Sequence, residues 1–291
     1  MKIYQKAGCI ILFFIMIFSC KKDASVRDQN QIISDSVTSN SKSVLLGRQN
    51  VITLSTGDYT YPTSQALMWI PFAYRNHSKR KTTFPLIINL YGQNQCGSTD
   101  LNKLLDGNTM SAYIAEGFNP AAVNPIDGKQ YAFFVCSPQC PVSWGWSASQ
   151  VYNMLEELKQ TYPVDTTRIY ITGFSCGGWG LWSCMTDKDA LTKQIAAIVP
   201  ISSAAADHPN ELTNVDKYKI ACLNICGDQD AFYSNAIDYT NIINSDDPSI
   251  PAELNTLHDV GHGGWSYAYD NTWKASNGLT IYEWMLQYKK K

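Results

Sequence analysis

Residues 168–178, which read RIYITGFSCGG, form the stretch of sequence that determines the fold. The first five residues of this stretch are rich in β-branched and aromatic side chains, which are typical of a strand. A glycine-rich turn follows, and after it comes a helix-compatible segment that contains Leu181, Trp182 and Met185. The sequence therefore predicts a sharp strand-to-helix turn with Ser175 at its centre, in the pattern G-x-S-x-G.

The residue types around Ser175 are those that an activated nucleophile requires. A sharp turn holds its central residue in strained backbone angles, and small residues on both sides let the neighbouring chains pass closely. The helix that follows directs its free N–H groups and its positive dipole end at the serine. We therefore predict that Ser175 is the nucleophile and that the Cys176 N–H group is one donor of an oxyanion hole. The Cys176 thiol is a rival nucleophile in principle, but it lies at the wrong position of the turn.

Strand-like and helix-like segments alternate outward from this turn. Residues 85–90 form a continuous apolar run, as expected of a strand buried on both faces. Residues 150–162 place their apolar side chains on one helical face, with Ser147 or Ser149 available as the N-cap and Pro163 at the end. Further strands are predicted at 51–54, 66–70, 132–136, 195–201, 220–226 and 254–258, and a closing helix at 280–287. This order predicts an α/β fold with a mostly parallel central sheet and helices on both faces.

Three segments of the chain carry a resemblance to a known superfamily. Residues 164–178 (VDTTRIYITGFSCGG) hold the serine turn, and residues 84–92 (FPLIINLYG) end a strand with Tyr91 where the relatives usually have histidine. Residues 137–141 (SPQCP) are followed by Trp144. Together these segments resemble the α/β-hydrolase superfamily, in particular its polyhydroxybutyrate-depolymerase, feruloyl and acetylxylan esterase and predicted-peptidase group. The resemblance covers about residues 84–288, and it implies an α/β-hydrolase fold and a serine hydrolase.

The acid of the site is expected after the serine, because the catalytic residues of this fold follow in the order serine, acid, histidine. The predicted strand 220–226 ends in the sequence GDQD at residues 227–230. The spacing G-x-x-D resembles the acid loop of the family, which implies Asp230 as the acid. Asp228 would more simply stabilise the turn through its own backbone.

The same resemblance also implies which histidine is the catalytic base. The chain has four histidines, and after Asp230 there remain His258 and His262. Residues 260–265 (VGHGGW) resemble the family's G-H-x-x-W loop, which implies His262, while His258 ends a predicted strand and is more simply a structural residue. By the same resemblance the N–H group of Gln93, the residue after Gly92, is the second oxyanion donor. Alternatively, the side chains of residues 93–95 bind substrate.

The aromatic residues offer candidate substrate contacts. The chain has eight tryptophans, and four of them, at 144, 146, 179 and 265, fall in loops or helix starts near the predicted site. We predict that Trp144, Trp179 and Trp265 bind substrate, with Trp144 and Trp265 as platforms for a sugar or aryl group. The remaining tryptophans, at 69, 182, 273 and 284, are expected to pack in the core.

The N-terminal residues predict export. Lys2 and Lys6 precede an apolar run at 7–18, which as a helix would span about 18 Å, less than the roughly 30 Å core of a bilayer. Residues 17–20 (IFSC) resemble a bacterial lipobox, so residues 1–20 are predicted to be a lipoprotein-type signal peptide with Cys20 as the lipidated residue. The alternatives are an ordinary signal peptide cut nearby and an uncleaved anchor.

Behind the signal peptide, residues 21–50 are rich in Ser, Asp, Asn and Gln and lack aromatic residues. They predict a disordered tether, and residues 51–291 the catalytic domain. We therefore expect a protein that is lipid-anchored to the bacterial outer membrane, on the periplasmic or cell-surface side.

Composition limits the partners and cofactors. The formal net charge of -2, with 16% charged residues, gives no basic surface for nucleic acid. Apart from Cys9 and Cys20 the body holds an odd number of cysteines, so at least one thiol stays free even where disulfides form. Cys222 and Cys226 would lie about 13 Å apart on a strand, which is too far for a disulfide. Because no Cys or His pairs have zinc-finger spacing, we expect no metal and no cofactor.

These features together predict an exported serine hydrolase that cleaves carboxylic esters, such as feruloyl or acetyl esters of polysaccharide fragments. Its predicted triad is Ser175, His262 and Asp230. The alternatives are a serine peptidase of the same fold and a non-catalytic binding lipoprotein. The expected partners are a small-molecule or oligosaccharide ester and, through the N-terminal lipid, a membrane.

Overall fold

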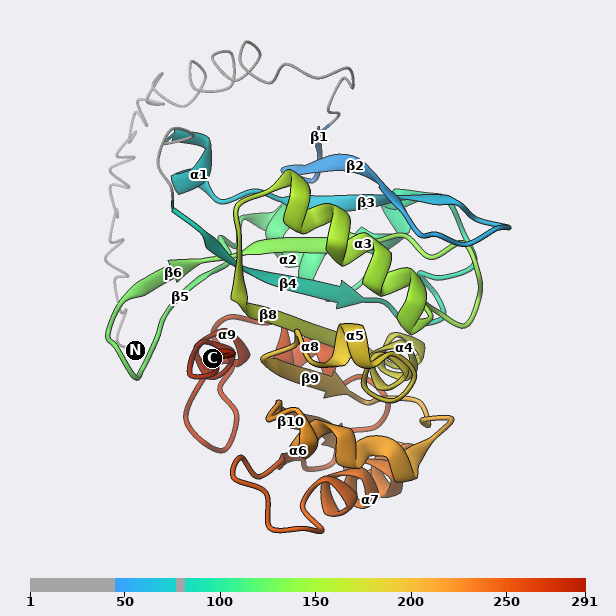
Figure 1. Cartoon of the computed structure of the whole chain (residues 1–291), viewed down its shortest axis with the longest axis vertical. Coiled ribbons are helices and arrows are strands. Elements are labelled where there is room, and N and C mark those ends of the chain that lie inside the picture. Colours follow the sequence, from blue (N-terminus) through green and yellow to red (C-terminus); the bar gives the residue numbers. More distant parts are fainter. Residues whose placement is uncertain (1–44, 77–81) are drawn as a thin grey trace, which may run out of the picture. The chain divides into compact units, whose positions relative to one another are not determined.

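The computed structural model describes residues 45–76 and 82–291, and its main element is a nine-stranded sheet in the order β1-β2-β3-β7-β4-β8-β9-β10-β11 (Figure 1). The strands β7, β4, β8, β9, β10 and β11 run parallel, whereas β1, β2, β3 and β7 pair antiparallel at one edge. The mostly parallel sheet predicted from the sequence is confirmed. Its strands are β1 (Leu45–Leu46), β2 (Gln49–Ser55), β3 (Thr63–Trp69), β4 (Phe84–Leu90), β7 (Phe134–Pro138), β8 (Val164–Phe174), β9 (Ala197–Ile201), β10 (Ala221–Gly227) and β11 (Glu253–Leu257).

Helices cover both faces of this sheet. The α-helices are α1 (Phe72–Asn76), α2 (Met110–Glu116), α3 (Ala148–Thr161), α4 (Cys176–Thr186), α5 (Asp189–Thr192), α6 (Asn214–Lys217), α7 (Tyr233–Ile243), α8 (Trp265–Ala268) and α9 (Ile281–Leu286). Two short 3-10 helices, η4 (Leu101–Leu105) and η5 (Pro209–Thr213), and a hairpin of β5 (Ala121–Val123) and β6 (Gln130–Ala132) complete the described elements. In Figure 1, α3, α4 and α7 lie in front of the sheet, and α2 lies behind it.

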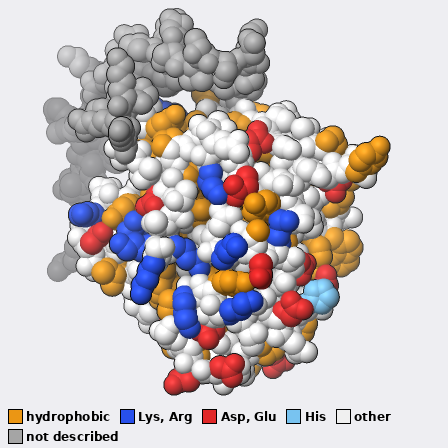
Figure 2. Space-filling view, viewed as in Figure 1, with side chains coloured by type: hydrophobic (Ala, Val, Ile, Leu, Met, Phe, Trp, Pro, Cys, Tyr) orange, Lys and Arg blue, Asp and Glu red, His pale blue; other side chains and the backbone are white. Residues whose placement is uncertain are grey.

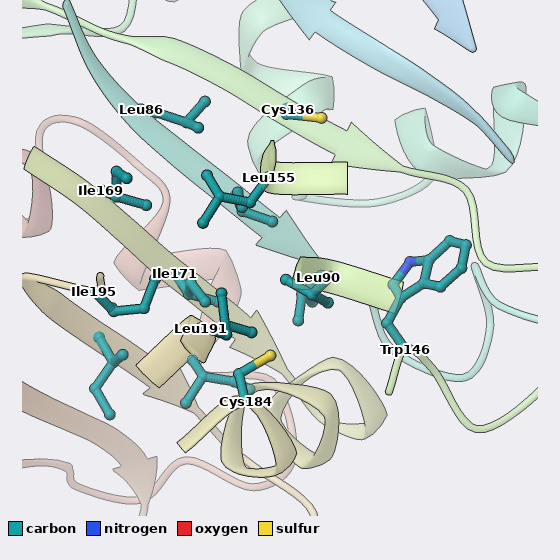
Figure 3. Packing of buried hydrophobic residues seen from close by; sticks show 14 of the residues in the cluster. Leu86, Leu90, Cys136, Trp146, Leu155, Ile169, Ile171, Cys184, Leu191 and Ile195 are labelled. Carbon is teal, nitrogen blue, oxygen red and sulfur yellow. The ribbon is translucent and has the colours of Figure 1, made fainter. Parts of the chain in front are cut away.

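The alternation of side chains along each strand divides the core into two hydrophobic clusters. On β4, Leu86 and Leu90 face the cluster that contains α3 and α4, whereas Ile87 faces the cluster that contains α2 and α9. Figure 3 shows the first cluster, where Leu155 of α3 packs over the sheet beside Leu86. The continuous apolar run at 85–90 therefore serves both faces, as predicted for a central strand.

Local signals place several helix ends. Ser147 caps α3 and forms a capping box with Gln150, and the helix ends before Pro163. Thr280 and Glu283 form the same arrangement at α9. The elements that the sequence analysis did not predict include α2, α7 and the β5–β6 hairpin, as well as β1 and the short helices α1, α5, α6, α8, η4 and η5.

The folded body begins earlier than predicted. Residues 45–50, assigned from the sequence to the tether, form β1, a turn and the start of β2, where Leu45 pairs with Asn50. Gln49 is fully buried, and its Nε2 donates a hydrogen bond to the Ser111 carbonyl at 3.1 Å. The amide nitrogen of this buried side chain is thus paired with a distant partner inside the fold, so the prediction of a tether was wrong for this part. The predicted signal peptide, Cys20 and residues 21–44 lie outside the described residues.

The surface of the described part carries mixed charge. Figure 2 shows Lys and Arg side chains interspersed with Asp and Glu on one face. Among residues 45–76 and 82–291, no helix is both long and apolar enough to cross a bilayer.

Candidate active site

Ser175 occupies the turn between β8 and α4, at the carboxyl end of the parallel strands. Its backbone angles are φ 53° and ψ -123°, a combination that a side-chain-bearing residue rarely adopts. Hydrogen bonds with β9 and with the loop after it hold this conformation: the Ser175 N–H donates to the Ile201 carbonyl at 3.2 Å, and the Ala204 N–H donates to the Ser175 carbonyl at 3.0 Å. The strained turn predicted from the sequence is therefore present.

The glycines of the pattern are required by close backbone contacts. A Cβ atom on Gly173 would lie 2.4 Å from the Gly177 carbonyl oxygen, and one on Gly177 would lie 2.2 Å from the Leu90 carbonyl oxygen. Backbone atoms in a packed sheet cannot move aside for a methyl group. Only glycine at these two positions lets α4 begin directly above β4 and β8.

The structure brings the three predicted catalytic side chains together. Ser175 Oγ lies 3.0 Å from His262 Nε2, and His262 Nδ1 lies 3.0 Å from Asp230 Oδ2. Ser175 follows β8, Asp230 follows β10 and His262 lies in the loop after β11. Because these strands are parallel, their carboxyl ends meet at one edge of the sheet, where residues far apart in sequence become neighbours.

The surroundings of Asp230 keep its carboxyl group ionised. The side chain is 0% exposed. Burial alone would raise the pKa of Asp230, but hydrogen bonds from His262, from the Phe232 N–H and from Ser202 lower this pKa below its ordinary value. A buried carboxylate that binds the Nδ1–H of His262 leaves Nε2 free to accept the Ser175 proton.

A second histidine–aspartate pair lies beside this one. His258 Nδ1 is 3.1 Å from Asp228 Oδ2, and the His258 side chain is 83% exposed. The other oxygen of Asp228 accepts a hydrogen bond from the Asp259 N–H at 2.9 Å, and thereby fixes the turn before the His262 loop. Neither His258 nor Asp228 hydrogen-bonds to Ser175 within the described residues.

Substitution of Asp230 and of Asp228 should have different effects on kcat. Asp230→Asn is expected to lower kcat by about 10⁴-fold, because an amide cannot hold the Nδ1–H tautomer of His262 or stabilise its imidazolium form. Asp228→Asn removes one contact of an exposed pair and should change kcat little. Steady-state kinetics on an aryl ester measures both variants, and equal losses in the two would argue against Asp230 as the acid.

The N–H groups of Gln93 and Cys176, which are the two predicted oxyanion donors, both act on the Cys176 thiol. Burial raises the pKa of the Cys176 thiol, while the Ser175 hydroxyl and the N–H groups of Gln93 and Cys176, which face the sulfur, oppose that rise. Neither N–H group donates to a backbone carbonyl among the described residues. Both N–H groups therefore remain available as the predicted oxyanion donors. The raised pKa keeps the thiol protonated and makes it a poor nucleophile.

Tyr91, which stands where the resembled family has histidine, anchors the loop that carries Gln93. Its side chain is buried, and its hydroxyl accepts a hydrogen bond from the Ser111 N–H of α2 at 3.3 Å. Its ring packs edge-on against Phe174, with the ring centroids 5.7 Å apart. The tyrosine thus fixes the first oxyanion loop between α2 and the serine turn.

The three predicted substrate-binding tryptophans differ in what they offer. Trp144 is 63% exposed, and its neighbour Gly145 lies against the start of α4, where an added Cβ would be 3.1 Å from the Cys176 carbonyl oxygen. Trp179 is half-buried. Trp265 stacks on Phe174 at 4.5 Å and meets the His262 ring edge-on at 5.1 Å. Trp265 therefore packs against His262, the predicted base, and the indole of Trp144 is more exposed and better able to contact a substrate.

Two neighbours of the triad had not been predicted. Phe232 packs edge-on against His262, with the ring centroids 5.5 Å apart, and Ser202 Oγ accepts a hydrogen bond from the Gly264 N–H, two residues after His262, at 3.3 Å. No motif in the sequence marks either residue, because each meets the triad only through the tertiary fold. Among residues 45–76 and 82–291, no group of His, Cys, Asp and Glu side chains could hold a metal ion.

Comparison with known proteins supports the fold. No protein-family model and no curated protein matches the chain. Among solved structures, a thermostable esterase matches with a TM-score of 0.59 and 17% identity, over 82% of this chain and 63% of that chain. The S-formylglutathione hydrolase of Staphylococcus aureus matches with a TM-score of 0.55 and 15% identity, over 81% of this chain and 98% of that chain. The feruloyl esterase module of Clostridium thermocellum, complexed with sinapinate, matches with a TM-score of 0.54 and 12% identity, over 84% of this chain and 89% of that chain.

These matches define the class of fold. The chain has the α/β-hydrolase fold, and it is related by structure to esterases. At these identities the likeness concerns the fold, and the chain spans less than two thirds of the thermostable esterase.

Proposed function

We propose that this chain is a serine hydrolase that cleaves carboxylic esters through an acyl-enzyme on Ser175. The observation that supports the proposal is the continuous hydrogen-bonded chain from Ser175 Oγ through His262 to Asp230, with 3.0 Å at both links. A buried carboxylate, an imidazole and a serine in this order form a proton-transfer chain.

In the proposed reaction, His262 takes the Ser175 proton while Oγ attacks the ester carbonyl carbon. The N–H groups of Gln93 and Cys176 stabilise the negative oxygen of the tetrahedral intermediate. His262 then gives the proton to the departing alkoxide, and an alcohol leaves. Water attacks the acyl-enzyme by the same steps and releases the carboxylic acid, which restores Ser175.

A fluorophosphonate probe tests the nucleophile directly, because it reacts covalently with activated serines. The probe is expected to label the purified protein on Ser175, as located by mass spectrometry of the peptides, and Ser175→Ala should remain unlabelled. Labelling at another residue, or none at all, would contradict the proposal.

Esters of polysaccharide fragments, such as feruloyl or acetyl esters, are the proposed substrates. The exposed indole of Trp144 beside the start of α4 suits a flat sugar or aryl group. The segments between the last strands contribute to the core: Val215 of α6 and Tyr239 of α7 belong to the hydrophobic cluster on one face of the sheet. In the described chain these segments pack on the sheet and leave little chain with which to grip a long peptide.

We expect esters to be hydrolysed efficiently and unactivated peptide amides poorly. An alkoxide leaves readily once His262 donates a proton, whereas an amide nitrogen requires firmer protonation and a better-held intermediate. The purified protein is to be assayed on feruloyl, acetyl-sugar and short aryl esters beside peptide amides. Efficient amide cleavage with negligible ester turnover would instead favour a serine peptidase of the same fold.

We also propose that the protein is exported and anchored to the outer membrane by lipid on Cys20. The support is the sequence of residues 1–20, with its basic start, short apolar run and lipobox-like end. In the native host, a fatty-acid label should appear on the mature protein and the protein should fractionate with membranes, while Cys20→Ser should lose both properties. Detection of an intact residue 1–19 segment on the mature protein would contradict the anchor.

A further inference from the structure

Two arginines lie against the ring of Trp69, the last residue of β3. The guanidinium carbon of Arg48, in the turn between β1 and β2, is 5.7 Å from the ring centroid, and that of Arg75 in α1 is 5.4 Å from it. The Arg75 guanidinium also lies 5.3 Å from the Phe72 ring, which meets Trp69 edge-on. Aromatic rings attract cations in such positions. We call these side chains, Arg48, Trp69, Phe72 and Arg75, the Trp69 cluster.

The positive charges of the Trp69 cluster are not balanced within the described chain. Among residues 45–76 and 82–291, no Asp or Glu forms a salt bridge with Arg48 or Arg75. Burial, and then the charge of Arg48, lower the pKa of Arg75 below its ordinary value. Two like charges beside one ring repel each other, and no carboxylate of the described residues offsets that repulsion.

Hydrogen bonding in the Trp69 cluster is also incomplete. Trp69 Nε1 and Arg75 Nη2 are buried N–H donors, and neither meets an acceptor in the part of the chain that the structure describes. Buried donors in proteins are nearly always paired, and an unpaired one is costly. The cluster therefore combines positive charge with donors in excess, and it lacks a negatively charged acceptor.

A phosphate group has the chemistry that the Trp69 cluster lacks. Its oxygens accept hydrogen bonds, and a phosphate monoester carries almost two negative charges at neutral pH, so it can bind two guanidinium groups. The planar fork of an arginine side chain matches a pair of phosphate oxygens. Arg48 is exposed and Arg75 is half-buried, so the cluster is open to solvent on one side.

The Trp69 cluster lies at the edge of the sheet opposite to the catalytic residues. Trp69 pairs with Val135 near the start of β7, whereas Ala66 pairs with Pro138 at the end of β7. Ser175 follows the end of β8, which runs parallel to β4 and therefore to β7. A ligand of the cluster is thus bound away from the reacting groups.

We propose that the Trp69 cluster is a binding site for a phosphate group, held by Arg48 and Arg75. The inference goes beyond the proposed function and does not depend on the chemistry at Ser175. Leu45 pairs with Asn50, and Asn50 pairs with Met68, so the chain that leads to the proposed lipid anchor joins the domain at the same edge. A phospholipid head group and a soluble phosphate compound share this chemistry, and the experiment distinguishes them.

NMR of the Trp69 indole tests the site without an assay of activity. Inorganic phosphate is added to the purified protein at constant ionic strength, and the Nε1–H signal of Trp69, assigned by comparison with Trp69→Phe, is followed. We expect a shift that saturates with phosphate. Arg48→Gln and Arg75→Gln are each expected to weaken phosphate binding by about 10-fold or more, the loss typical of a hydrogen bond between charged groups.

Arg168→Gln is the matched control for these variants. Arg168 also lies over an aromatic ring, 4.8 Å from the Tyr131 centroid, but it is paired with Asp165 at 3.0 Å. Because this pair already supplies the acceptor, Arg168→Gln should bind phosphate as the parent does.

Sedimentation with vesicles identifies the source of the phosphate. The proposed mature chain, residues 21–291, is prepared without lipid and mixed with vesicles of phosphatidylcholine, with or without phosphatidylglycerol. Sedimentation that requires phosphatidylglycerol and weakens by about 10-fold in both Arg→Gln variants would assign the site to a lipid head group. Binding of inorganic phosphate without such sedimentation would assign it to a soluble phosphate compound.

A Trp69 signal that does not respond to phosphate would overturn the inference, as would equal phosphate affinity in the parent and both Arg→Gln variants. Circular dichroism establishes that each variant is folded. Should Arg75→Gln fail to fold, Arg75→Lys takes its place: it keeps the charge beside the rings, loses the guanidinium fork, and is also expected to weaken phosphate binding.

Discussion

Replacement of Ser175 by alanine is expected to lower turnover by about 10⁶-fold while leaving the fold intact. The substitution removes the oxygen that lies 3.0 Å from His262 Nε2, so no acyl-enzyme can form. The residual rate above that of water would come from the oxyanion donors and from substrate binding. Alanine carries the same backbone strain at φ 53° as serine, so the turn should persist.

The measurement combines ester kinetics with thermal unfolding. A variant with an unchanged melting temperature and no detectable turnover agrees with Ser175 as the nucleophile. Near-normal turnover on every substrate that the parent cleaves would transfer the role to another group, with the adjacent Cys176 thiol as the first to test.

His262→Ala should be as damaging as the serine substitution, at about 10⁶-fold in kcat. His262 bridges Ser175 and Asp230 with two hydrogen bonds, whereas His258 pairs with Asp228 at the surface. His258→Ala is therefore expected to leave kcat within a few-fold of the parent, since exposed pairs contribute little.

The two histidines make a matched comparison, because both lie in the same segment after β11. Each variant is checked by circular dichroism before kinetics. A reversed ranking among folded variants would assign the base to His258 and would require the loop to rearrange on substrate binding.

The elements that could be predicted from the sequence carry their signal locally. The run at 85–90 is apolar at nearly every position because β4 is buried on both faces, and α3 shows its cap at Ser147 and its end at Pro163. The serine turn is equally local, since Gly173 and Gly177 are required by contacts within one strand–turn–helix unit and the neighbouring strand. Such features need no knowledge of distant partners.

The elements that were missed depend on partners far away in the chain. α7 buries Ala236, Tyr239, Thr240 and Ile243 at helical spacing, but alanine and threonine give a weak apolar signal. Gln49 looks like part of a polar tether until Ser111 is known to accept its hydrogen bond.

In the candidate active site, too, the residues with a local sequence signal could be predicted and those that depend on distant partners could not. The motifs pointed to Ser175, Asp230 and His262, and in the structure His262 lies within hydrogen-bonding distance of the other two. Ser202 carries no motif, because its contacts arise where β9 lies between β8 and β10. For the same reason the sequence could not show that Phe174 covers one side of Trp265.

The contact between Trp265 and His262 gives the site an optical signal of its own. The indole and imidazole rings lie 5.1 Å apart, edge to face. A protonated imidazole accepts an electron from an excited indole and quenches its fluorescence, whereas the neutral ring does so far less. The emission of Trp265 is therefore expected to depend on the protonation state of His262, so this part of the tryptophan fluorescence should report on the proposed base in the resting protein, without a substrate or a label.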